Sequence, residues 1–535
     1  MTLLSRTSIR SWMVASTVLV ATVATPFSAV HAETPPDTLV QAWQIDDIIS
    51  LDPAEIFEVS SWEIATNTYE RLIKFDAKDA SKIYGDVAES WTVSGDGLTY
   101  TFKIREGKKF ASGNPLTAED VVFSLRRSIS LDKSPAFIIG QLGLDKSNAQ
   151  EKIKQTGPFE LTVTVDKPYA PTLVLYCLTA PVASIVDKQL VKQHESGDDL
   201  GYNWLKTHYA GSGPFSIRDW KANEAVVLER NPYYVKAAPL ARVIYRHIKE
   251  TATQRLLLEK GDVDIARNLS PEEIEAVSKN PDIKIDEGPS GTIYYLGLNQ
   301  KNPNLARPEV REALKWLVDY SAIADTIMKY KGEVHQTFLP EGYLGAINEN
   351  PYKLDVAKAK ELLAKAGLKD GFTITMDTRS TPDISSIAQA MQATFAQVGI
   401  KLEIIPGDNK QTLTKYRARQ HDIYIGTWGS DYPDPNSNAG MFAKNDDNSD
   451  NAKAKPLAWR NAWDPGALTV KTRAAVMERD AEKRAQMYSE LQEAVLKDGP
   501  YVIFLQEIQV IAERKAVDGF FIGLDTNSVA QAKKN

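Results

Sequence analysis

The sequence has one cysteine and six histidines in 535 residues. The single Cys177 excludes an intramolecular disulfide, and its apolar surroundings predict a buried, inert thiol. The histidines are dispersed, so no Cys/His cluster of metal-binding spacing exists. The motifs GxSxG, HExxH, GxxxxGK[ST] and GxGxxG are also missing. These absences argue against a disulfide scaffold and a zinc module, and they lower the expectation of catalysis.

An excess of positive charge is missing as well. The chain carries 63 Lys and Arg against 70 Asp and Glu, a net charge of −7, without a basic stripe. Nucleic-acid binding is therefore not expected. The composition, 43% hydrophobic and 25% charged, is that of ordinary globular proteins. Because single cores stop growing at about 250–300 residues, we expect at least two lobes.

Long hydrophobic runs are absent except at the N-terminus. Two arginines precede the apolar run Trp12 to Ala24, which is shorter than the about 20 residues of a spanning helix. The small residues Val30 and Ala32 follow at the positions of a cleavage site. This pattern predicts a signal peptide over 1–32, cut after Ala32. The alternative is an uncleaved anchor helix. An exported acidic protein that begins at Glu33 and has no disulfide fits a bacterial periplasm.

The second half of the chain has an α/β pattern. Phe372–Met376 alternates as a strand, an apolar stripe over 384–398 predicts a helix, and Ile400–Ile405 predicts the next strand. Such a crossover implies parallel strands. After the last long helix, Tyr501–Ile511 returns as a strand.

The stretch Gly426–Pro435 is the most informative motif. It follows a predicted strand, Asp422–Gly426, and ligands of open α/β sheets bind beyond the carboxyl ends of strands. Asp431 is therefore expected at a crevice, with Trp428 as an apolar wall. A carboxylate there suits a ligand ammonium group. The alternative is plain turn chemistry, because Asp and Pro dominate turns.

Two further segments carry charge in suggestive positions. Arg379 follows the strand Phe372–Met376, and its planar fork suits a carboxylate, although a solvated surface arginine is the alternative. Asp446–Asp450 is similar to a calcium loop. Asn451, however, stands where the loop needs Gly, and Leu457 where it needs Glu. We expect a solvated acidic loop, with weak cation binding as the alternative, and we expect no metal site and no cofactor.

These segments also carry a family resemblance. The stretch Ala88–Val121 resembles the signature of the large peptide-type solute-binding proteins of ABC importers (dipeptide, oligopeptide, opine and nickel binders). Other family-like pieces follow in order along the chain: Leu51–Pro53, Tyr69–Leu72, Gly211–Phe215, Asn231–Tyr234, Gly261–Asp264, Leu298–Asn299, Arg311–Leu314 with Asp319, and Val398–Ile400. The resemblance is specific for the family but not for a ligand.

The resemblance implies an α/β fold of the two-lobed periplasmic-binding-protein type (type II-like), with a subdomain inserted in the first lobe at roughly 77–205. We expect lobe 1 over 33–288, completed by 507–535, and lobe 2 over 289–506. The series of strands and helices after Pro289 and the returning last strand motivate these bounds. Two chain crossings would then join the lobes, and no sheet would be continuous between them.

Site residues follow from the same resemblance. Asp431, beside Trp428 and Gly429, matches the Asp that holds the peptide α-amino group in dipeptide and oligopeptide binders. Arg379 matches the Arg that takes the ligand carboxylate in dipeptide binders. The resemblance therefore implies that a zwitterion is held at both of its ends.

Lobe 1 would face the cleft with Phe57, Glu58 and Val59. Phe57 stands where an oligopeptide binder carries an acidic residue, which argues against long peptides. We expect a periplasmic receptor without enzymatic activity that delivers a short peptide or similar small zwitterion to an ABC permease. The alternative ligands are an opine, a sugar conjugate, haem or a nickel chelate, and the alternative class is a periplasmic hydrolase.

Overall fold

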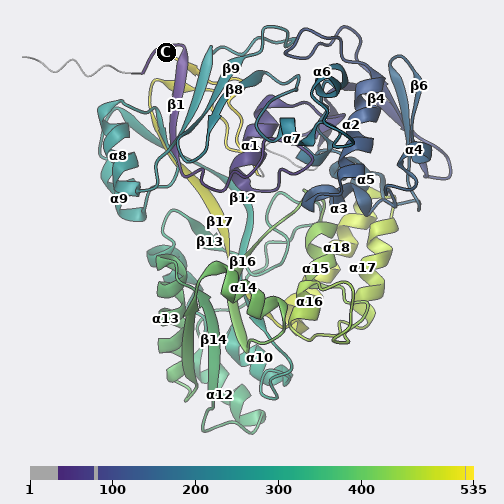
Figure 1. Cartoon of the computed structure of the whole chain (residues 1–535). Coiled ribbons are helices and arrows are strands. Elements are labelled where there is room, and N and C mark those ends of the chain that lie inside the picture. The colour runs from purple at the N-terminus through teal and green to yellow at the C-terminus, as the bar shows by residue number, and fades with distance from the viewer. Residues whose placement is uncertain (1–33, 77–81, 525) are drawn as a thin grey trace, which may run out of the picture.

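The computed structural model describes residues 34–76, 82–524 and 526–535. The predicted signal peptide and its cleavage site lie outside these residues. Within them, helices and strands are mixed as the sequence predicts, and two lobes are stacked one above the other (Figure 1).

One sheet of eleven strands extends through both lobes. Its order is β15-β14-β16-β12-β17-β11-β1-β10-β9-β8, and β13 pairs with β17. The strands are β1 (Thr38–Trp43), β8 (Phe215–Lys221), β9 (Ala225–Arg230), β10 (Arg242–His247), β11 (Ile265–Ala266), β12 (Ile283–Leu298), β13 (Gly332–Val334), β14 (Thr373–Arg379), β15 (Lys401–Gly407), β16 (Ile423–Gly429) and β17 (Tyr501–Arg514).

Helices cover this sheet in both lobes. In lobe 1 they include α1 (Val59–Thr68), α8 (Thr251–Lys260) and α9 (Pro271–Val277). In lobe 2 they are α10 (Pro308–Lys315), α11 (Tyr320–Ala322), α12 (Val356–Lys365), α13 (Pro382–Ala396), α14 (Asn409–Arg417), α15 (Asn436–Phe442), α16 (Leu457–Arg460), α17 (Ala467–Met477) and α18 (Ala481–Asp498).

Two long antiparallel strands, β12 and β17, join the lobes (Figure 1). The two crossings are as expected, but the expectation that no sheet is continuous between the lobes is wrong. The strands are 16 and 14 residues long, so they bond to each other and to strands of both lobes. Their register shifts between Pro289 and Ile293. The predicted boundaries, 288/289 and 506/507, fall inside these strands, and the exact bounds stay a prediction.

A separate four-stranded antiparallel sheet lies within the range predicted for the inserted subdomain. Its order is β4-β5-β7-β6. The strands are β4 (Ala88–Val93), β5 (Thr99–Ile104), β6 (Ile153–Gly157) and β7 (Glu160–Thr164), packed with α2 (Ala118–Leu131), α3 (Phe137–Gly140), α4 (Ala149–Lys152) and α5 (Pro171–Cys177). A capping box begins α2, where Asp120 accepts a hydrogen bond from the Thr117 amide at 2.9 Å. Cys177 is fully buried in this core, as expected.

Lobe 2 contains the predicted βαβ unit. β14 and β15 are parallel, with α13 between them in sequence. Asp355 caps α12 by accepting a hydrogen bond from the Lys358 amide at 2.8 Å. β14 and β16 both extend three residues beyond their predicted ends, to Arg379 and Gly429. Arg379, Trp428 and Gly429 are therefore strand residues and do not belong to the loops that follow.

The lobes also touch at a second place, where α3 and α5 lie above α15, α17 and α18 (Figure 1). Tyr432 of lobe 2 is 4% exposed and packs in the core of the subdomain. Its hydroxyl donates to Oε1 of Gln141 at 3.1 Å. Buried Arg484 of α18 bonds both Asp434 at 2.8 Å and the Thr172 hydroxyl at 2.9 Å. These contacts tie the loop after β16 to the opposite lobe.

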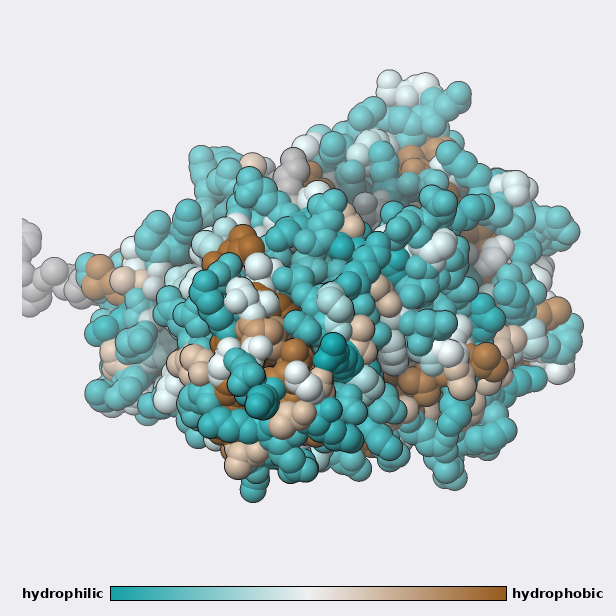
Figure 2. Space-filling model, turned by 90° about the horizontal axis from the view of Figure 1, so that it is seen from below, coloured by the Kyte–Doolittle hydropathy of each residue, from teal (hydrophilic) through white to brown (hydrophobic). Residues whose placement is uncertain are grey.

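The lower end of the molecule presents a mostly polar surface. Figure 2 shows hydrophilic residues over most of this face, with hydrophobic ones gathered mainly in one area on its left. Throughout the described ranges, none of the helices combines the length and the apolarity that crossing a bilayer requires.

Candidate ligand-binding cleft

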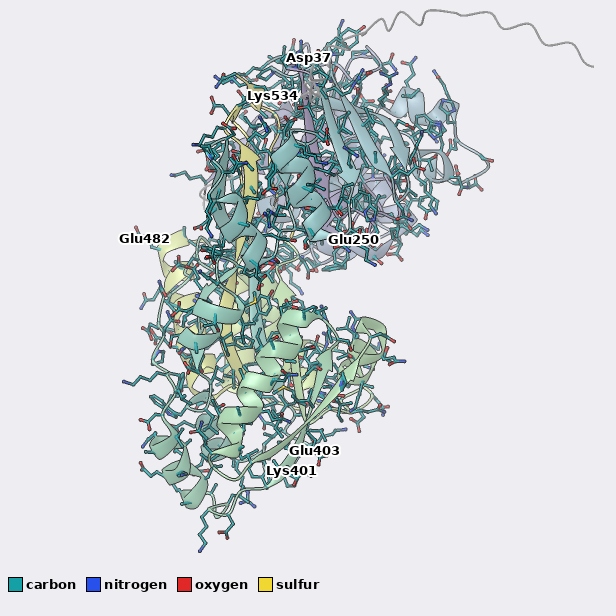
Figure 3. All side chains as sticks on the ribbon, turned by 90° about the vertical axis from the view of Figure 1, so that its left-hand side faces the viewer. Asp37, Glu250, Lys401, Glu403, Glu482 and Lys534 are labelled. Atoms are coloured by element: carbon teal, nitrogen blue, oxygen red, sulfur yellow. The ribbon has the colours of Figure 1, made fainter. Side chains whose placement is uncertain are left out.

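A cavity of about 950 Å³ lies between the lobes. Lobe 1 contributes Trp43, Trp62 and Glu63, and the two joining strands contribute Ser290 and Glu507. Figure 3 shows the lobes one above the other, with Glu250 on the edge of the upper lobe that faces the lower one. The volume is within the range of small-molecule sites, about 300–1,000 Å³. Walls from both lobes make this a clamp that can enclose a ligand.

Four of the predicted site residues line this cavity: Phe57, Val59, Gly429 and Asp431. Phe57 is 39% exposed and Val59 is 74% exposed, so the start of α1 presents apolar side chains to the open space. Exposed apolar groups in a concave site are suited to contact with a ligand. The first lobe therefore supplies an apolar wall.

Trp428 does not line the cavity. Its indole nitrogen donates to Oδ1 of Asn438 at 3.0 Å, and its ring meets Phe442 edge-on at 6.2 Å. Successive side chains of a strand point to opposite faces, so Trp428 turns away where Gly429 meets the cavity. Trp428 thus contacts α15, through Asn438 and Phe442, and does not form the expected wall of the cavity.

Arg379 and Glu58 are also outside the lining. The Arg379 guanidinium donates to the Tyr424 hydroxyl at 3.4 Å, and its Nε is buried without a partner. Glu58 precedes α1, and its carboxylate accepts a hydrogen bond from the Phe57 amide at 3.3 Å. In this structure, therefore, neither side chain lines the cavity.

Asp431 lies in the loop after β16. Its amide donates to the Ser437 hydroxyl at 2.9 Å, which fixes the backbone. Among the described residues, nothing donates to its half-buried carboxylate or pairs with it. Burial raises the pKa of Asp431 to about 6, while the charge of Arg460 opposes the shift. A carboxylate that is partly desolvated and unpaired can accept a cation from a ligand.

A charged pair in lobe 1 could not be predicted from the sequence. The guanidinium of Arg267 donates to both oxygens of Glu63, at 3.0 and 2.9 Å. It also lies over the Trp43 ring, 4.3 Å from the centroid. The paired residues are 204 positions apart, so no local pattern signals them.

Other polar residues of the lining were also missed, among them Tyr294, Lys331, Asp383 and Glu507. Glu507 accepts a hydrogen bond from the Ser290 hydroxyl at 2.9 Å. Burial raises the pKa of Glu507, although the Ser290 hydrogen bond opposes the shift. Asp383 is in the first turn of α13, where acids are common because they favour a helix N-terminus. Because this common role already explains an acid at the position, sequence analysis does not single out Asp383 as a site residue.

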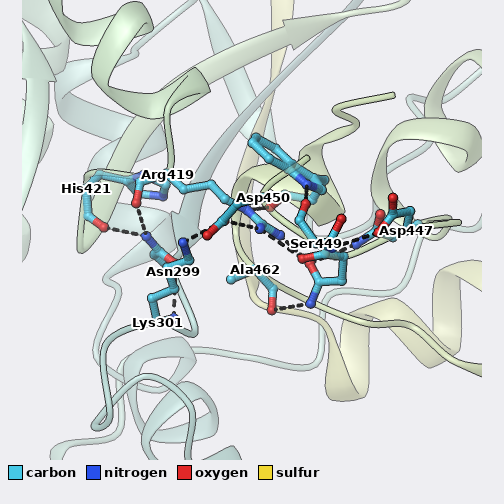
Figure 4. Close-up of polar contacts among 11 residues, drawn as sticks. Asn299, Lys301, Arg419, His421, Asp447, Ser449, Asp450 and Ala462 are labelled. Carbon is cyan, nitrogen blue, oxygen red and sulfur yellow. Dashed lines mark hydrogen bonds and ion pairs between the residues drawn. The ribbon is translucent and has the colours of Figure 1, made fainter. Parts of the chain in front are cut away.

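The acidic loop 446–450 is engaged by protein cations. Asp450 pairs with Lys301 at 2.8 Å and with Arg419 at 3.2 Å, and Asp447 accepts from the Ser449 amide at 2.8 Å (Figure 4). In the part of the chain that the structure describes, no three His, Cys, Asp or Glu side chains are grouped as a metal site. The carboxylates of Asp450 and Asp447 are thus bonded to residues of the same lobe.

The two lobes and the cavity between them define a clamp for a solute. Comparison with known proteins agrees, because residues 82–450 match the family described as "Bacterial extracellular solute-binding proteins, family 5 Middle". The chain belongs to this family of solute-binding proteins.

Individual relatives cover almost the whole chain. The probable D,D-dipeptide-binding periplasmic protein DdpA of Escherichia coli (strain K12) is 30% identical over 511 residues, 94% of this chain and 95% of that protein. The glutathione-binding protein GsiB of Salmonella paratyphi A is 25% identical and covers 89% of this chain and 90% of its own length.

A solved structure shows the same fold. The periplasmic binding protein DppA of Helicobacter pylori, in complex with the peptide STSA, has 26% sequence identity and a TM-score of 0.75. It covers 93% of this chain, and 98% of its own chain is matched. The predicted fold class and family are therefore confirmed.

Proposed function

We propose that this chain is the substrate-binding subunit of an ABC importer and that it captures a short peptide by its free α-amino group. The observation that carries the proposal is the unpaired Asp431 carboxylate in the interlobe cavity. A protonated amine placed there gains a charge-assisted hydrogen bond in a partly desolvated site. The names of the relatives, which bind D,D-dipeptides and glutathione, support a small peptide-like ligand.

The chain acts by binding and carries out no chemistry in this proposal. Lobe closure about β12 and β17 would enclose the ligand, which is then delivered to a permease at the inner membrane. The N-terminal pattern supports export to the periplasm. Intact mass of protein recovered from the periplasm tests the location, with a chain beginning at Glu33 expected. Incubation with peptides should give no cleavage products, and turnover would refute the binding role.

Titration calorimetry is the direct test of the ligand. Purified mature protein is first freed of bound solute by mild unfolding and refolding, then titrated with Ala-Ala, D-Ala-D-Ala, glutathione and N-acetylated Ala-Ala. Peptides with a free amine should bind, and the acetylated peptide should not, because acetylation removes the ammonium group that would pair with Asp431. Equal binding of the free and acetylated forms would contradict the proposal. Native mass spectrometry of gently purified protein would give the mass of any ligand carried along.

A further inference from the structure

Two positively charged side chains line the cavity among the described residues, Arg267 and Lys331. The Arg267 charge is already matched by Glu63 through two hydrogen bonds, and the Arg267 side chain is only 6% exposed. Removing that guanidinium from its partner would leave a buried carboxylate uncompensated. Arg267 is therefore a poor receptor for a ligand anion.

Lys331 differs because its ammonium group has no hydrogen bond or ion pair within the described chain. Its backbone, in contrast, is held on both sides. The Lys331 amide donates to the Met328 carbonyl at 2.8 Å, and its carbonyl accepts from the Ile508 amide of β17 at 2.9 Å. The residue thus stands at a fixed place beside the joining strands, with a free charge in the cavity.

The surroundings of Lys331 include two carboxylates of the lining, Glu507 and Glu272. Neither is close enough for an ion pair with Lys331. Burial raises the pKa of Glu507, so its repulsion of a nearby anion is reduced. Glu272 lies in the first turn of α9, a position that stabilises a carboxylate on its own helix. Lys331 therefore keeps hydrogen-bonding capacity for a ligand.

A second donor lines the same cavity. Tyr294 is 6% exposed and lines the cavity, and in the described structure its hydroxyl is without a hydrogen-bond partner. Glu507 is a charged neighbour of both Tyr294 and Lys331, and Asp383 and Arg379 are further charged neighbours of Tyr294. An ammonium group and a phenol that line the same cavity can each donate to one oxygen of a ligand carboxylate.

Given a zwitterionic peptide held at Asp431, as the proposed function requires, we propose that Lys331, assisted by Tyr294, receives the ligand's carboxylate in place of Arg379. Arg379 lies outside the lining and donates to Tyr424, and although its charge acts on Tyr294, its guanidinium would have to leave Tyr424 to bond the ligand. Lys331 needs no such change. The ligand then spans the cavity from the loop after β16 to the segment that precedes β13.

The test compares Ala-Ala with its C-terminal amide on five proteins: wild type, Lys331→Met, Tyr294→Phe, Arg379→Met and Lys329→Met. Lys329 is the matched control, because its side chain is 44% exposed and outside the lining. Wild type should prefer the free acid by about tenfold or more, as is typical of a desolvated charge pair. Lys331→Met should lose this preference by weakening the acid alone, and Tyr294→Phe should reduce it by about threefold. The other two variants should keep it.

The outcomes separate the inference from the proposed function. If Arg379→Met abolishes the preference while Lys331→Met keeps it, or if wild type binds acid and amide equally, the inference is wrong and peptide binding stands. If wild type binds neither form, nor any other free-amine peptide, the proposed function fails first. Far-ultraviolet circular dichroism and thermal unfolding confirm that each variant is folded before its titration is interpreted.

Discussion

Two carboxylates line the same cavity from opposite lobes and have opposite surroundings. Glu63 in α1 accepts two hydrogen bonds from Arg267 and one from Asn527, at 3.0, 2.9 and 3.1 Å. Asp431 in lobe 2 has no such partner among the described residues, and burial raises its pKa to about 6. The charge of Glu63 is compensated within the protein. The charge of Asp431 can be compensated only by a group from outside the protein, such as a ligand cation.

This difference separates residues that maintain the fold from residues that bind. Removing one partner of a compensated buried pair leaves an uncompensated charge and destabilises the fold. Removing an uncompensated charge takes away a cost of burial, so only ligand binding suffers. The two carboxylates should thus respond in opposite ways to the same amide substitution.

The largest effect is expected for Glu63→Gln. Breaking a buried ion pair from one side costs about 3–5 kcal/mol, so the free energy of unfolding should fall by that amount. Urea unfolding followed by circular dichroism measures it. Glu229→Gln is the control, because Glu229 pairs with Arg218 and Arg242 at a surface where all three side chains are at least 39% exposed. It should change stability by less than about 1 kcal/mol. Equal effects of the two variants would contradict the structural role of Glu63.

Asp431→Asn should keep the fold and impair binding. Truncating one partner of a buried charge pair costs about 2–5 kcal/mol, which lowers affinity by about thirtyfold or more. The free energy of unfolding without ligand should not fall, because the variant lacks a buried charge. Calorimetric titration with zwitterionic dipeptides decides the matter. Binding within about threefold of wild type would remove Asp431 from the site.

Binding should also depend on pH through the same carboxylate. With a pKa of about 6, Asp431 is ionised above that pH and protonated below it, while the ligand ammonium stays charged. Affinity should therefore weaken as the pH falls through about 6, approaching tenfold per pH unit. Asp431→Asn should show a flat profile over the same range. A wild-type affinity that is unchanged between about pH 7 and pH 5 would contradict the pairing.

The smallest effect is expected on the apolar wall of lobe 1. Phe57→Ala removes a half-exposed ring from the cavity and should weaken a ligand with an apolar side chain by about fivefold, about 1 kcal/mol. Stability should hardly change, because the ring is 39% exposed. Val235→Ala is the control, since Val235 is 79% exposed and outside the lining. The same titrations measure both variants, and equal affinities would exclude Phe57 from ligand contact.

Local patterns allowed much of the fold to be predicted. The β14-α13-β15 unit depends on residues close together in sequence, and hydrophobic periodicity identified it. The Thr117–Asp120 capping box and the Asp355 cap are local in the same way. The same signals set strand ends too early: β16 continues to Gly429, because pairing with β12 extends it beyond its apolar run. That pairing joins segments more than 100 residues apart, and no local rule contains it.

The site was less predictable than the fold. Asp431 could be placed because it follows a strand end, where α/β sheets bind ligands. Trp428 and Arg379 were assigned to the cleft by their positions in a motif. The direction of a side chain in a strand, however, depends on the strand's register. Trp428 bonds to Asn438 and Arg379 to Tyr424, and neither lines the cavity. Lys331 and Glu507 meet the cavity only because β13 pairs with β17. Contacts of this kind appear only when the topology is known.

The burial of Tyr432 has a consequence for the lifetime of the complex. Tyr432 is adjacent to Asp431 but packs in the core of the opposite subdomain, with its hydroxyl on Gln141. Separation of the lobes therefore draws a phenol ring from an apolar core into water, or else carries the subdomain along with lobe 2. In the first case the activation free energy of ligand escape includes this exposure, whatever the ligand. The dissociation rate would then depend on a side chain that contacts the protein alone.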